Sequence, residues 1–73
     1  MFFCEFQNRE TGEVFGRVRH RIHAAAQTCV YRTLLALQES DIDARETAHI
    51  AAEGMGVWTD ASPHGFSARI WSE

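Results

Sequence analysis

Hydrophobic positions between Ile22 and Gln38 repeat at helical spacing and predict the one long helix of the chain. We expect the side of this helix that faces the core to be broad. It comprises Ile22, Ala25, Ala26, Cys29, Val30, Thr33, Ala36 and Leu37. Tyr31 and Leu35 project from the opposite side, one turn apart, where they should touch each other. Two bulky residues on that side need a second packing partner, in addition to the sheet, to cover them.

Alternating apolar and polar residues predict strands at 2–7 and 13–19, joined as a hairpin by turn residues at 8–12. One face of this hairpin would meet the helix and carry Phe2, Cys4, Phe6, Val14, Gly16 and Val18. Phe3 and Phe15 would then point to the other face. A short strand at 57–60 and an alternating strand at 66–72 predict a closing hairpin, with the only proline in the turn at 61–65.

The segment 43–53 has two interpretations. Asp43 and Glu46 match a capping box, and Gly54 is a suitable stop for a second helix. The apolar side of that helix would be thin, with Ala44, Ala48, Ala51 and Ala52. A strand over 47–52 is the alternative, because Ala48, Ile50 and Ala52 also alternate with their neighbours. We favour the helix.

These elements predict a single compact α+β domain over residues 1–73, with an antiparallel β-sheet and one long α-helix packed on one face. The expected order is hairpin, helix, short helix or strand, hairpin. The other face of the sheet has no second layer and would meet water. No apolar run approaches the roughly 20 residues of a membrane helix, and residues 1–6 do not resemble a signal peptide. We therefore expect a cytoplasmic protein without a membrane partner.

The outer face of the sheet is the most informative surface. We expect it to expose Phe3, Phe15 and Trp71, interleaved with Arg17, Arg19 and Arg69, and joined by either Val57 or Trp58. Aromatic residues and arginine are enriched in the cores of protein interfaces, so this face predicts a contact site for a protein partner. Tyr31 and Leu35 would form a second contact site or the seam of a homodimer.

Single-stranded nucleic acid is an alternative ligand for the same face, because bases stack on aromatic rings and arginines hold phosphates. Glu5 and Glu13 would oppose phosphates, and no RNA-recognition signature is present. The formal net charge of −3 also argues against general nucleic-acid binding.

A basic run precedes the long helix. Arg19, Arg21 and His23 would lie near its positive end, which favours an anion such as a phosphate or an acidic partner surface. A solvated strand end is the simpler interpretation.

The histidines and cysteines raise the question of a metal site. His20 and His23 are three residues apart and could face one ion, with His49, Cys4 or Cys29 completing the set. No Cys-x-x-Cys pair supports this, and the two cysteines are more typical of small buried thiols than of a disulfide scaffold. We expect neither a metal nor another cofactor.

Catalytic chemistry is not indicated. Cys29 lies on the buried side of the predicted helix, which opposes a role as an exposed nucleophile. The carboxylates of Glu39, Asp41, Asp43 and Glu46 are explained as helix caps and a solvated loop. No Gly-rich phosphate loop or nucleophile motif is present, so we expect a protein that is not an enzyme.

The layout from Met1 to Glu73 is a hairpin, an Ala-rich helix and a closing hairpin in a small domain that contains arginine but no lysine. This layout resembles small phage and mobile-element proteins that inhibit host defence, anti-CRISPR proteins among them. The resemblance implies a non-enzymatic inhibitor that binds a host nucleoprotein complex. It assigns no functional residue, because it is carried by no shared motif. A single-stranded nucleic-acid-binding module and a self-assembling structural or regulatory subunit are the alternatives.

Overall fold

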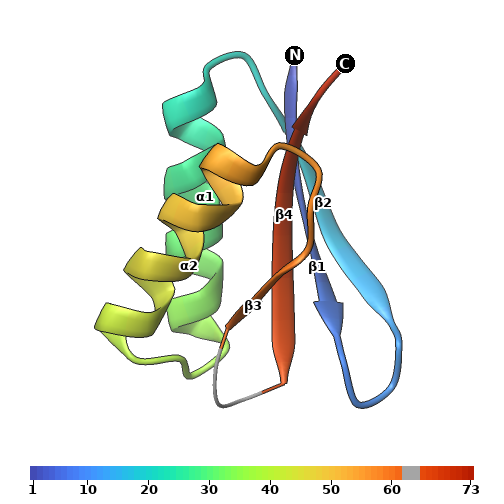
Figure 1. The fold of residues 1–73 in the computed structure, drawn as a ribbon, viewed down its shortest axis with the longest axis vertical. Helices are drawn as coiled ribbons and strands as arrows, with labels where there is room; N and C mark the ends of the chain where they lie inside the picture. The colour runs from blue at the N-terminus through green and yellow to red at the C-terminus, as the bar shows by residue number, and fades with distance from the viewer. Residues whose placement is uncertain (62–64) are drawn as a thin grey trace.

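The computed structural model describes residues 1–61 and 65–73, which form a four-stranded antiparallel sheet and two helices (Figure 1). The elements are β1 (Phe2–Asn8), β2 (Val14–His20), α1 (His23–Ala36), α2 (Asp41–Gly54), β3 (Thr59–Ala61) and β4 (Phe66–Ser72). The strands lie in the order β2-β1-β4-β3. The predicted α+β class and antiparallel sheet are confirmed, but the structure has two helices of 14 residues each, rather than one long helix and a shorter second element.

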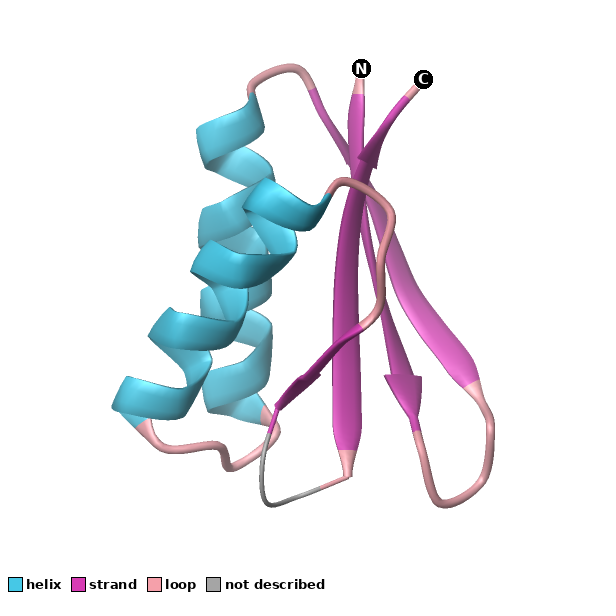
Figure 2. Cartoon of the chain, viewed as in Figure 1, coloured by secondary structure: helices cyan, strands magenta, loops and turns pink. Residues whose placement is uncertain are grey.

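Both helices lie on the same face of the sheet (Figure 2). α1 contacts mainly β1 and β2 and also touches β4, whereas α2 contacts β3 and β4. The opposite face carries no covering element within the described ranges. Within residues 1–61 and 65–73, neither helix is long and apolar enough to cross a membrane.

Both predicted hairpins are present. β1 pairs with β2 and also with β4, and β3 pairs with β4, all antiparallel. The two chain ends meet, because the backbone N–H of Glu73 donates to the carbonyl oxygen of Met1 at 3.0 Å. Of the turn predicted at 61–65, residues 62–64 lie outside the described residues.

A β-bulge at Gly16 changes the parity of β2. Cys4 pairs with Val18, but Phe6 pairs with Phe15, so the register shifts by one residue between these pairs. Gly16 has a φ of +72°, and a Cβ atom built on it would lie 2.9 Å from Cδ2 of Phe6. Glycine is the residue that accepts this backbone conformation and this close approach.

The bulge turns Phe15 toward the helices, so the prediction that Phe15 points into solvent is wrong. Its ring centroid lies 5.9 Å from that of Phe6 and 6.1 Å from that of Phe66, at the edge of the core. Val14 was expected inside, but it pairs with Gln7 on the outer face and is exposed. Val18 does share the face of Cys4, yet it too is exposed, because β2 is an edge strand.

The core is built mainly from small and medium side chains. The buried hydrophobic residues are Cys4, Phe6, Ala26, Val30, Leu34, Ala44, Ala48, Ala51, Ala52, Ala61, Ala68 and Ile70. The predicted buried side of α2 is confirmed. That of α1 is only partly correct, because Leu34 is buried while Ile22 is 66% exposed. α1 packs against α2 as well as the sheet, which turns Leu34 inward.

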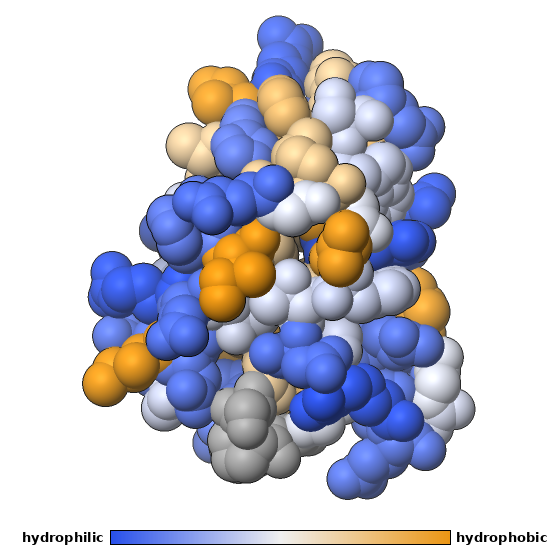
Figure 3. Space-filling view, viewed as in Figure 1, coloured by the Kyte–Doolittle hydropathy of each residue, from blue (hydrophilic) through white to orange (hydrophobic). Residues whose placement is uncertain are grey.

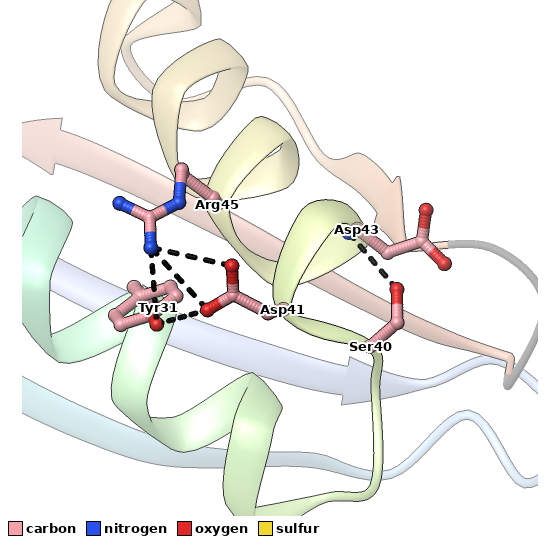
Figure 4. Close-up of polar contacts among 5 residues, drawn as sticks. All are labelled: Tyr31, Ser40, Asp41, Asp43 and Arg45. Atoms are coloured by element: carbon pink, nitrogen blue, oxygen red, sulfur yellow. Dashed lines mark hydrogen bonds and ion pairs between the residues drawn. The ribbon is translucent and has the colours of Figure 1, made fainter.

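The helical interpretation of 43–53 is confirmed, with different ends. Ser40 is the N-cap, and its hydroxyl accepts a hydrogen bond from the backbone N–H of Asp43 at 3.1 Å (Figure 4). The helix thus begins at Asp41, and Asp43 is not the cap. At the other end Gly54 is still helical, and Met55 takes the left-handed conformation with a φ of 42°.

Candidate functional site

Six side chains contact one another on the open face of the sheet. We call them the outer-face cluster, which consists of Phe3, Glu5, Arg17, Trp58, Arg69 and Trp71. The pairing of β1 with β4 places Phe3 opposite Trp71 and Glu5 opposite Arg69. Arg17 comes from β2, and Trp58 precedes β3. Four segments of the chain therefore build one surface.

The aromatic rings of the cluster are in contact with guanidinium groups. Phe3 and Trp71 stack, with centroids 5.4 Å apart and an angle of 18° between their planes. The guanidinium carbon of Arg69 lies 4.7 Å from the ring centroid of Trp71 and 4.5 Å from that of Trp58. That of Arg17 lies 5.3 Å from the Trp71 centroid. These distances are typical of cation–π contacts, which hold each group in a defined place.

Glu5 ties the two arginines together. Its Oε1 accepts from Nη2 of Arg69 at 2.6 Å and from Nε at 3.2 Å, while its Oε2 lies 3.3 Å from Nε of Arg17. The Glu5 side chain is only 9% exposed because these partners cover it. Burial of a carboxylate costs free energy unless it is paired and hydrogen-bonded, and the two arginines supply that pairing.

The structure also places the other residues that were predicted for the outer face. Arg19 is exposed and pairs in register with Phe3, so it borders the outer-face cluster. Trp58, rather than Val57, is the member of that pair which joins the cluster. The indole N–H of Trp71 donates to Oε2 of Glu73 at 2.7 Å. Glu5 was expected only as a charge opposing phosphate. The sequence signal was that Glu5 shares strand parity with Phe3, whereas its place between two arginine-bearing strands follows from the strand order β2-β1-β4.

The second cover expected over Tyr31 is α2 of the same chain. The Tyr31 hydroxyl donates to Oδ1 of Asp41, and the guanidinium carbon of Arg45 lies 5.0 Å from the Tyr31 ring centroid (Figure 4). The bond to Asp41 raises the pKa of Tyr31 and lowers the pKa of Asp41. Tyr31 therefore docks α2 on α1, which corrects its expected role in a dimer seam. Leu35 is exposed.

The predicted anion site does not assemble. Nε2 of His23 lies 2.9 Å from the carbonyl oxygen of Ala52, to which it donates, and its ring lies 5.2 Å from that of Phe2. His23 is thus directed toward α2, while Arg19 lies on the outer face of the sheet. Arg21 is exposed in the bend between them.

Three of the five potential metal ligands named from the sequence come together on the helix side of the sheet. The Cys4 thiol donates to Sγ of Cys29 at 3.2 Å, and Nε2 of His20 lies 3.7 Å from Sγ of Cys4. Burial and the hydrogen bond with Cys29 raise the pKa of Cys4 to about 12. Of the expected partners of His20, Cys4 and Cys29 are therefore close to it, whereas His23 faces Ala52, and His49 is exposed and pairs with Glu53. Strand parity could have indicated that His20 lies near Cys4. His20 is two positions after Val18 and therefore lies on the same face of the sheet as Cys4.

Exposed hydrophobic residues on the α2 side are scattered. Ile42, Ile50 and Val57 are exposed, and the face shown in Figure 3 has separate orange groups among blue ones rather than one continuous patch. Isolated residues of this kind are normal on protein surfaces. They do not compete with the outer-face cluster as a contact site.

No family model, curated protein or solved structure matches the chain. Two arrangements in the described residues are suited to holding a ligand: the outer-face cluster and the Cys4, His20 and Cys29 group. The outer-face cluster is the larger, and it lies on the face that both helices leave open.

Proposed function

We propose that this chain is a non-enzymatic protein-binding module whose contact surface is the outer-face cluster. The observation that carries this proposal is the set of three aromatic rings and two guanidinium groups in mutual contact on an uncovered sheet face. Tryptophan and arginine are the residue types that most often dominate the binding energy of protein interfaces.

The cluster is already ordered without a partner. Free arginine side chains lose rotamer freedom when they bind, and this opposes association by about 0.5–1.5 kcal/mol for each side chain. Here Glu5 and the indole rings hold Arg17 and Arg69 in place before any contact is made. A partner therefore meets a preorganised surface.

The charge of the cluster indicates the chemistry of the partner. Two arginines against one glutamate leave the cluster a formal charge of +1, and the neighbouring Arg19 and Glu73 offset each other. The Arg17 side chain is 60% exposed and can pair with a further carboxylate. The matching surface is an apolar patch with one or two acidic residues at its edge.

Affinity capture from cells that carry the natural partner tests this proposal. The double variant Phe3→Ala, Trp71→Ala removes the stacked ring pair, and we expect the captured partner to bind at least about 30-fold more weakly, the effect of a hot spot of about 2 kcal/mol. The matched control is Ile42→Ala, Ile50→Ala, which shortens two exposed side chains on α2. Circular dichroism checks that each variant is folded. Equal recovery with both double variants, or no partner with the unaltered chain, would contradict the proposal.

A narrower form of the proposal identifies the partner as a host defence nucleoprotein complex, with the chain acting as a phage-encoded inhibitor. The small size and α+β layout support it, as they are shared with anti-CRISPR proteins. Expression of the chain in a host with active CRISPR immunity should restore plaque formation by a targeted phage. The Phe3→Ala, Trp71→Ala variant should lose this effect and the α2 control should keep it. Failure of the unaltered chain to restore plaques in such hosts would contradict the narrower form alone.

Single-stranded nucleic acid is the second candidate ligand. It is favoured because Arg17, whose side chain is 60% exposed, lies beside the stacked rings of Phe3 and Trp71. The pairing of Arg17 and Arg69 with Glu5 weakens this candidate, because phosphates would compete with a carboxylate already in place. A labelled oligonucleotide should bind at low salt, with an affinity that falls steeply as salt rises. No binding at low salt would eliminate it.

A further inference from the structure

We propose that Cys4, His20 and Cys29 form a zinc site with three protein ligands and one open position. This site is separate from the outer-face cluster and does not depend on the proposed binding function. The donor set carries the first part of the inference. Two cysteine thiolates and one imidazole are ligand types that Zn²⁺ prefers and are poor ligands for Mg²⁺ or Ca²⁺, and the two thiols release their protons to solvent when the ion binds.

The distances between the donor atoms are close to those of a tetrahedral site. With Zn–S bonds of about 2.3 Å, two thiolates on one ion lie about 3.8 Å apart. The two sulfur atoms are 3.2 Å apart, and Sγ of Cys4 lies 3.7 Å from Nε2 of His20. All three donor atoms lie within 4.8 Å of one another. The two distances from Cys4 are within about 0.6 Å of these tetrahedral values, and His20 and Cys29 would approach each other by at most about 1.2 Å to share the ion.

The three ligands come from different elements. Cys4 lies on β1, His20 is the last residue of β2, and Cys29 lies in the middle of α1. Cys4 is fully buried, whereas His20 and Cys29 are half-buried. A bound ion would therefore join the first hairpin to the helix that covers it, and it would be reached from the side of His20 and Cys29.

The fourth position faces an open hollow. Its lining consists of His20, Ala25, Thr28, Cys29, Arg32 and Thr33. Within 1–61 and 65–73, the group contains no fourth histidine, cysteine or carboxylate. Water would complete the coordination, and the positive charge of Arg32 in the lining favours an anionic ligand in its place. Three protein ligands with one open position are the arrangement of accessible rather than purely structural zinc sites.

Metal titration of the full, reduced chain tests the site, with Co²⁺ as the spectroscopic probe and Zn²⁺ as the competitor. We expect one Co²⁺ per chain, thiolate-to-cobalt charge-transfer absorption, the visible bands of tetrahedral cobalt, and loss of both on addition of one equivalent of Zn²⁺. Cys29→Ser and His20→Asn should each weaken binding at least about tenfold. His49→Gln, which alters an exposed histidine that pairs with Glu53, should bind as the unaltered chain does. Thermal unfolding without metal identifies any variant that fails to fold.

Four results would overturn the zinc assignment, of which the first three come from the titrations. These three are absence of charge-transfer absorption with the unaltered chain, unchanged affinity in folded Cys29→Ser and His20→Asn, and equal weakening by His49→Gln. If the reduced chain binds neither metal and instead forms a Cys4–Cys29 disulfide in air, the group is a thiol pair. That result also overturns the assignment.

Discussion

At the scale of single residues, Gly16 determines which side chains reach the outer face. Its left-handed backbone permits the bulge that turns Phe15 into the edge of the core while Arg17 remains on the outer face. A side chain at this position would strain the backbone and press on the buried ring of Phe6. The composition of the outer-face cluster therefore depends on one glycine that contributes no side chain to it.

Gly16→Ala should lower the free energy of unfolding by about 1–3 kcal/mol, because it combines a strained φ with an overpacked core. Gly12→Ala is the matched control, since Gly12 also has a positive φ, of +78°, but nothing lies within 4 Å of a Cβ atom there. Urea unfolding of both variants separates the two effects. Equal losses in the two variants would show that contact with Phe6 contributes nothing.

Glu5 is the second residue on which the surface depends. Glu5→Ala leaves Arg17 and Arg69 without their shared carboxylate, and we expect the free energy of unfolding to fall by about 1–3 kcal/mol. Glu5→Gln keeps one acceptor oxygen and should lose less. The exposed Glu46 provides the control, since Glu46→Ala should change stability by no more than about 0.5 kcal/mol. Urea unfolding measures all three, and an effect of Glu5→Ala as small as that of the control would refute the pairing role.

At the scale of elements, a polar contact fastens the two helices to each other. Tyr31 on α1 bonds to Asp41 on α2, and Arg45 lies over the Tyr31 ring one turn further along α2 (Figure 4). The folded-state pKa of Asp41 is lowered, so its contribution to stability is present above the unfolded pKa of aspartate and is lost as the pH falls through the folded value. The folded-state pKa of Tyr31 is raised, so its contribution is present below the unfolded pKa of tyrosine and is lost as the pH rises through the folded value.

Tyr31→Phe should therefore reduce stability most at neutral pH and progressively less toward both extremes. The loss is small, because the contact is exposed to solvent. Urea unfolding of the unaltered chain and the variant across pH 2–11 measures the difference. A difference that is constant with pH would show that the hydrogen bond to Asp41 does not contribute.

The elements themselves are largely readable from the sequence. Period-two alternation locates β1 and β4, and the spacing of four alanines identifies the buried side of α2. The buried side of α1 is harder to predict from the sequence, because α1 packs against both the sheet and α2. The outward direction of Phe15 was wrong because a bulge at an interior glycine leaves no trace in the alternation of residue types. The predicted start of α2 was too late in the sequence, because Ser40, Asp41 and Asp43 are all acceptable N-caps.

At the scale of the whole molecule, the two proposed sites lie on opposite sides of one sheet. The outer-face cluster occupies the open face, whereas Cys4 is buried between β1 and the helices. Strand parity predicted that Phe3, Arg17, Arg69 and Trp71 share the outer face, but the pairing of β1 with β4 that brings them into contact was not predicted. The Cys4, His20 and Cys29 group was harder to predict, because it joins two strands and a helix that lie apart in the sequence. Substitutions at one site should therefore leave the other intact.

The central claim is that the outer-face cluster is the surface a protein partner contacts. Hydroxyl-radical footprinting of the complex measures this directly, because Trp58 and Trp71 are half-buried and oxidisable in the free chain. We expect oxidation of both indoles to fall several-fold when the partner is bound, while Tyr31 on the helix side stays as reactive as before. Unchanged oxidation of Trp58 and Trp71 together with protection of Tyr31 would place the contact on the helices and contradict the account.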